Sequence, residues 1–98
     1  MPTSETDINR LLGQVITKRR KELKLSQDVV AQRANHSRTY YSDIERGLRN
    51  ISVMALHNIA QALETEACTL LAQVEAMRAG NSHQAHLRVV ELKENDTA

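Results

Sequence analysis

The stretch of sequence that decides the fold is residues 25–47, LSQDVVAQRANHSRTYYSDIERG. Ser26 can cap a helix of about two turns over residues 27–34, because a serine hydroxyl accepts a hydrogen bond from the first free backbone N–H groups. Asn35 is expected to end this helix, since asparagine tolerates the left-handed backbone conformation that a tight turn needs. The first half of the stretch therefore predicts a short helix followed by a turn.

The second half of the stretch predicts another short helix. Ser37 can cap it, residues 38–46 form it, and Gly47 ends it. Two short helices joined by a tight turn within an all-helical chain indicate a helix-turn-helix.

Helical patterns continue on both sides of this motif. Residues 8–24 carry apolar side chains at the spacing of an amphipathic helix. Ser52 can cap a fourth helix, and a fifth helix follows Glu64-Thr65 and ends at residues 80–82. The inward positions expected for the fourth and fifth helices are Leu56, Ile59, Ala60, Leu63, Leu70, Leu71, Val74 and Met77. The predicted fold class is all-α, with five helices.

The expected division of the chain has three parts. Residues 1–7 form a flexible N-terminus, residues 8–79 the helix-turn-helix domain and residues 80–98 a C-terminal extension. The extension holds one apolar cluster, LRVVEL at residues 87–92, whose paired valines favour a strand.

Length and composition favour binding over catalysis. A chain of 98 residues forms one small domain, and a pocket that encloses a substrate would hollow out much of its core. The sequence contains no nucleophile elbow or phosphate-binding loop. It also shows no secretion signal and no run of about 18 apolar residues. We therefore expect a cytoplasmic, nucleoid-associated protein that is not an enzyme.

No metal or other cofactor is expected. His83 and His86 are three residues apart, with Cys68 and His57 elsewhere, but no acidic or cysteine ligand stands beside the histidine pair. Such histidines are far more often surface residues than metal ligands. Cys68, as the single cysteine, cannot form an internal disulfide and is expected to pack as a small apolar residue.

The net charge of +1 hides a strong asymmetry along the chain. Residues 1–9 carry two acidic groups, and residues 50–98 carry three basic and six acidic groups. Residues 10–49 carry ten basic and four acidic groups, a net charge of +6. A basic region of this size is the electrostatic footprint of a polyanion partner such as DNA, although a solvated basic helix face would have the same composition.

The second helix of the motif can be phased at 100° per residue. Tyr41 and Ile44 then point toward the core, while Arg38 and Tyr40 flank the opposite face. The residues expected to point outward are Thr39, Ser42, Asp43 and Arg46. Such a face offers the donors, acceptors and charge that base edges and phosphates require, although an ordinary solvated helix face is polar as well.

Residues spread over positions 8–77 carry a resemblance to a known family. They are Leu12-Gly13, Ile16, Arg20, Leu25-Ser26-Gln27, Val30-Ala31, the run 37–47, Arg49-Asn50, Leu56, Ile59-Ala60 and Leu63. This pattern resembles the Cro/C1-type (XRE family) helix-turn-helix, a five-helix DNA-binding domain, and residues 38–50 also resemble restriction–modification controller proteins. The sequence departs from the family at Asn35 and Glu64, where glycine is usual, and at His36, where an aliphatic residue is usual.

The resemblance implies roles for individual residues. Arg20 and Glu45 match a family ion pair that ties the first helix to the third. The matches to base-contacting positions are Arg38, Thr39, Ser42 and Asp43, and the matches to positions that contact the DNA backbone are Gln27, Ser37, Tyr40, Arg46, Arg49 and Asn50. A bidentate contact of Arg38 with guanine is the base contact we expect first. Asp43 would accept a hydrogen bond from cytosine N4 or orient Arg46.

A homodimer on a palindromic operator is the predicted assembly, because specific operators usually offer two half-sites about one helical turn apart. Leu71, Val74 and Met77 of the fifth helix are the expected interface, with residues 87–92 a further candidate. The predicted function is a transcriptional regulator that binds specific DNA sequences. The alternative is an antitoxin or similar module that masks a protein partner. A toxin-like neighbouring reading frame would favour that alternative, and a palindromic upstream site would favour the regulator.

Overall fold

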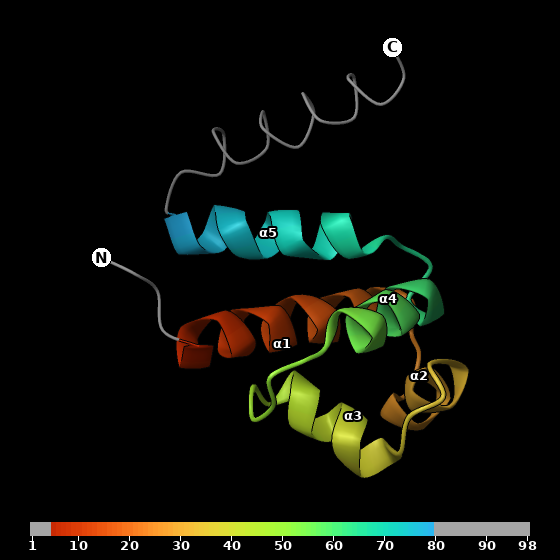
Figure 1. Ribbon diagram of the computed structural model, residues 1–98. Coiled ribbons are helices and arrows are strands. Elements are labelled where there is room, and N and C mark those ends of the chain that lie inside the picture. The colour runs from red at the N-terminus through yellow and green to blue at the C-terminus, as the bar shows by residue number, and fades with distance from the viewer. Residues whose placement is uncertain (1–4, 80–98) are drawn as a thin grey trace.

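The computed structural model describes residues 5–79, which form an all-α fold. Its helices are α1 (Glu5–Glu22), α2 (Gln27–Arg33), α3 (Arg38–Glu45), α4 (Val53–Ala62) and α5 (Ala67–Ala79). Helix α1 packs against both α5 and α3, while α4 contacts α2 and α5. In Figure 1, α5 and α3 lie on opposite sides of α1, with α2 beside α3. The five predicted helices are confirmed, and the segment 87–92 lies outside the described residues.

Helix α1 is displaced toward the N-terminus relative to the prediction. It begins at Glu5 instead of residue 8. Within this extra turn, Asp7 lies 3.8 Å from Arg10, one turn further along. At the other end, Lys24 adopts φ 58°, a left-handed conformation that ends the helix before the predicted boundary.

Three serine caps begin the helices as predicted. The hydroxyls of Ser26, Ser37 and Ser52 each accept a hydrogen bond from the backbone N–H three residues later, at 3.2, 3.1 and 3.0 Å. Asn35 has φ 61°, which confirms the left-handed turn between α2 and α3. Glu64 has φ 57° after α4, so this glutamate also occupies a conformation that glycine adopts at lower cost.

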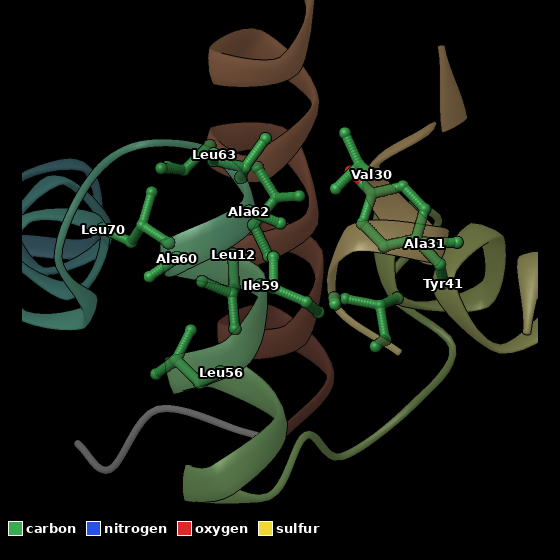
Figure 2. Packing of buried hydrophobic residues seen from close by; sticks show 14 of the residues in the cluster. Leu12, Val30, Ala31, Tyr41, Leu56, Ile59, Ala60, Ala62, Leu63 and Leu70 are labelled. Carbon is green, nitrogen blue, oxygen red and sulfur yellow. The ribbon is translucent and has the colours of Figure 1, made fainter. Parts of the chain in front are cut away.

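The core lies between all five helices. Figure 2 shows that buried side chains converge from α1 (Leu12), α2 (Val30), α3 (Tyr41), α4 (Leu56) and α5 (Leu70). With no Phe or Trp in the chain, aliphatic side chains and the fully buried ring of Tyr41 fill the interior.

Helix α1 passes very close to the end of α3 at Gly13. A Cβ atom on Gly13 would lie 2.7 Å from the carbonyl oxygen of Ile44 and even nearer to that of Glu45. Only glycine allows this approach, because any side chain would strike backbone atoms that cannot move aside. The close crossing brings the last turn of α1 within reach of the last residue of α3.

Candidate nucleic-acid interface

Helix α3 presents two opposite faces, as the phasing predicts. Tyr41 and Ile44 are buried against the other helices, and Thr39 is exposed on the opposite side. The outer face holds a shallow hollow lined by Arg38, Thr39, Ser42, Asp43 and Arg46. The structure therefore brings together the four predicted base-contacting residues and one predicted backbone-contacting arginine on one surface.

Arg38 is linked to helix α2 at the edge of this hollow. Its Nε atom lies 3.4 Å from Oδ1 of Asp28, in the first turn of α2. Both side chains are well exposed, so the pair contributes little to stability and can open when a stronger partner approaches. The guanidinium is thus free to exchange a carboxylate for a base edge or a phosphate.

Arg46 and Arg49 both bind the Asp43 carboxylate. Arg46 Nη2 donates to Oδ1 at 3.3 Å, and Arg49 Nε donates to Oδ2 at 3.2 Å. The Arg49 guanidinium also lies over the ring of Tyr40, 5.5 Å from its centroid. The contact with Arg46 is one of the two roles that the sequence predicts for Asp43. The contact with Arg49 was not predicted, because Arg49 is six positions away in the loop after α3 and carries no helical spacing signal.

A nearly buried ion pair fixes the end of α3. Arg20 Nε and Nη2 donate to the two carboxylate oxygens of Glu45 at 2.7 and 3.1 Å, which confirms the predicted pair. The side chains are 13% and 4% exposed. Arg20 Nη1 also donates to the carbonyl oxygen of Leu25 at 3.0 Å, so this arginine holds the end of α3 and the start of the helix-turn-helix together.

The ion pair shifts the ionisation of its members. Burial alone would raise the pKa of Glu45, but the hydrogen bonds that the carboxylate accepts, from Arg20 above all, and the charge of Arg20 together outweigh burial, so the pKa of Glu45 falls below its ordinary value. The hydrogen bond to Glu45 raises the pKa of Arg20. Burial, reinforced by Glu45, raises the pKa of the neighbouring Tyr41 hydroxyl. Both members of the pair are therefore charged at neutral pH, and Tyr41 is protonated.

Gln27 braces α2 against α3. Its Nε2 atom donates to Oε1 of Glu45 at 2.9 Å, so the side-chain amide joins the ion-pair cluster at the first residue of α2. The bracing part of the role implied by the family resemblance is therefore present. A contact of Gln27 with phosphate remains a prediction.

Two other residues expected at the DNA backbone are not part of the lining of the hollow. Ser37 is the exposed N-cap of α3, and its hydroxyl is engaged with the N–H of Tyr40. Asn50 is exposed in the loop after α3, where its Oδ1 atom accepts a hydrogen bond from Asn9 of α1 at 2.7 Å. The contact with Asn9 fixes the loop relative to α1.

His36 occupies the turn where the family usually has an aliphatic residue. Its ring packs against Tyr40, with the two centroids 5.0 Å apart. Its Nε2 atom is buried and has no hydrogen-bond partner among residues 5–79. The ring therefore acts mainly as an apolar spacer beneath the turn.

The predicted dimer interface is partly wrong. Val74 is 1% exposed and packs in the core of a single chain, because the buried side of α5 is the side that carries Leu70 and Val74. It cannot meet a second copy. Leu71 and Met77 are exposed, and their contact with a second copy remains a prediction. Val53 is a further exposed apolar residue. The sequence did not point to it, because Val53 is the first residue of α4 and is not one of the predicted inward positions of that helix.

The described part of the chain holds neither a cluster of three or more metal-ligand side chains nor a helix able to cross a membrane. Cys68 is exposed at the start of α5, so the expectation that it packs inside is wrong. His83 and His86 lie outside the described residues.

Comparison with known proteins gives consistent matches. Residues 16–70 match the Helix-turn-helix family. The control protein C.MunI of Mycoplasma sp is 39% identical over 70 residues, which are 70% of this chain and 95% of that protein. The crystal structure of the restriction–modification controller protein C.AhdI from Aeromonas hydrophila superimposes with a TM-score of 0.61 at 33% identity, over 62% of this chain and 92% of that one.

A further solved structure is that of the controller protein C.Esp1396I, a tetramer in complex with its natural 35-base-pair operator. It matches with a TM-score of 0.63 and 31% identity, over 68% of this chain and 88% of that one. The sequence match, these relatives and the arrangement of α2 and α3 agree. The chain belongs to the Cro/C1-type helix-turn-helix family of DNA-binding regulators.

Proposed function

We propose that this protein regulates transcription by binding a palindromic operator as a homodimer, with α3 in the major groove of each half-site. The observation that carries the proposal is the outer hollow of α3, where Arg38, Thr39, Ser42, Asp43 and Arg46 meet on the basic part of the chain. A helix fits the major groove, and each base pair presents a distinct set of donors and acceptors there.

The proposed roles follow from position on this surface. Arg38 is the first residue of α3, and the N-terminal residues of recognition helices usually contact base edges. Arg38 would therefore contact guanine, because its fork of donors matches guanine O6 and N7. Arg46 and Arg49, at and after the C-terminal end, would contact phosphates and fix the register of the helix on the duplex. Thr39 and Ser42 would supply short hydroxyl contacts between them.

Assembly from two copies is supported by geometry and by a relative. One copy offers a single recognition helix, whereas specific sites usually present half-sites about 34–36 Å apart. The tetramer of C.Esp1396I on its operator shows that a relative binds DNA as an assembly of several copies. On this chain, Leu71 and Met77 are exposed apolar residues of α5, and Figure 1 shows α5 on the other side of α1 from α3, so these two residues are the proposed contact. Such a role on the chromosome also fits a non-enzymatic, cytoplasmic protein.

Selection of bound duplexes from a random pool tests the proposal. We expect recovery of a palindrome whose half-sites are about one helical turn apart, or a multiple of that distance. Size-exclusion chromatography with light scattering of the protein, alone and with the selected duplex, should give two protein copies per palindrome. Recovery of no common sequence would refute the proposed function, and a protein partner that co-purifies and blocks DNA binding would favour the antitoxin role.

A further inference from the structure

The Asp43 carboxylate is turned toward two arginines of the same surface. Its side chain is 18% exposed, whereas those of Arg46 and Arg49 are 63% and 50% exposed. One carboxylate oxygen binds Arg46, and the other binds both Nε and Nη2 of Arg49, at 3.2 Å each. A partly covered carboxylate with both oxygens engaged presents little free acceptor surface to a base.

The same contacts hold two like charges in a defined place. Arg46 caps α3 and Arg49 lies three residues further on, so their guanidinium groups would repel each other without the acid between them. Arg49 is held from a second side by the Tyr40 ring. A long arginine side chain loses conformational entropy when it is ordered, so prior ordering makes each later phosphate contact less costly.

We propose that Asp43 is a positioning residue that acts on DNA through Arg46 and Arg49 and contacts no base itself. Its negative charge fixes the spacing of the two cations before the duplex arrives. This inference rests on the proposed function, since it assigns Arg46 and Arg49 to the phosphates. It decides between the two roles that the sequence left open for Asp43.

The test uses a duplex of about 30 base pairs that the wild-type protein selects from a random pool. Asp43→Asn keeps the shape of the side chain and removes its charge. We expect operator affinity to fall about tenfold and the plot of log affinity against log salt to become shallower by about one unit, as for one lost phosphate contact. The ranking of operators with single base-pair substitutions should stay unchanged, and Asp43→Glu, which keeps the charge, should recover the wild-type salt slope.

A double-mutant cycle with Arg49→Ala shows whether the effect passes through the arginine. In that background we expect Asp43→Asn to change affinity less than about threefold, because coupled residues are not additive. Thermal unfolding checks that each variant is folded at the assay temperature. If Asp43→Asn is not, Asp43→Ser replaces it with the same expectations.

Three results would overturn the inference. Loss of preference at one base pair alone would make Asp43 a base-contacting residue. Equal effects of Asp43→Asn with and without Arg49 would make the two residues independent. Unchanged or tighter operator binding would mean that the carboxylate only offsets positive charge. If the wild-type protein selects no sequence, the proposed function fails, and this outcome is distinct from any behaviour of the Asp43 variants.

Discussion

Replacing Glu45 by glutamine keeps the size of the side chain but leaves the Arg20 guanidinium charged and nearly buried without its partner. Breaking a buried pair on one side costs about 3–5 kcal/mol. Arg20 retains its hydrogen bond to the Leu25 carbonyl, which favours the lower end of that range. For a domain of this size, a loss of about 3 kcal/mol lowers the melting temperature by roughly 12–24 °C.

Far-UV circular dichroism at neutral pH measures this change. Asp28→Asn is the matched control, because it also removes a carboxylate from an arginine, but both side chains of the Asp28–Arg38 pair are more than half exposed. The free energy of unfolding of this control variant should fall by less than about 1 kcal/mol. A Glu45→Gln variant that melts within about 3 °C of wild type would refute the structural role of the pair.

The pH dependence gives a second readout of the same pair. Because the pKa of Glu45 is lower in the folded state than its ordinary value of 4.5, its contribution to stability is complete above that value. The contribution is lost as the pH falls through the lower folded-state pKa. We therefore expect the difference in melting temperature between wild type and Glu45→Gln to be constant near neutral pH and to narrow below about pH 4.5. A difference that widens in acid would contradict the direction of the shift.

Four further predictions address the other parts of the molecule. Arg38→Ala should cost about 1–3 kcal/mol of operator-binding free energy and weaken the preference for one base at one position of the operator. Arg49→Ala should reduce the affinity for all DNA sequences equally in gel-shift titrations, and the plot of log affinity against log salt should become shallower by about one unit. Gly13→Ala should lower the free energy of unfolding by about 1–3 kcal/mol in urea titrations, because the new Cβ atom meets the backbone of α3. This loss should exceed the gain from the better helix propensity of alanine, so a more stable variant would refute the close crossing. Glu64→Gly should raise that free energy by about 0.5–1 kcal/mol, since glycine relieves the left-handed strain, and an unchanged urea midpoint would count against it. Leu71→Glu should give a folded monomer that binds the operator weakly, which sedimentation equilibrium and circular dichroism would measure. A folded dimer would show that the interface does not include Leu71.

The local parts of the fold were predictable from sequence. The serine caps and the left-handed Asn35 depend on residues within four positions of one another, so the boundaries of α2 and α3 differ from prediction by at most one residue. The ion pair of Arg20 and Glu45 was implied by family resemblance and agreed with the phase of α3.

Features that depend on packing were not predictable in this way. Helix α5 carries apolar residues around much of its circumference, so periodicity could not tell that Val74 is buried while Leu71 is exposed. The contact of Asp43 with Arg49 depends on the path of the loop after α3. Loop geometry is set by tertiary contacts such as the one between Asn9 and Asn50, which are far apart in sequence.

Because of the close crossing at Gly13, α1 rigidly connects the DNA-facing helix α3 to α5. Helix α3 is fastened to α1 at that crossing and through Arg20, and α5 packs along the same helix. If α5 joins two copies, the angle between the copies determines the relative orientation of their two α3 helices. Each recognition helix would sit about 17 Å from the two-fold axis, so a tilt of about 10° would shift it by about 3 Å. That shift approaches the rise of one base pair, so substitutions on α5 could change the preferred half-site spacing without altering any residue that touches DNA.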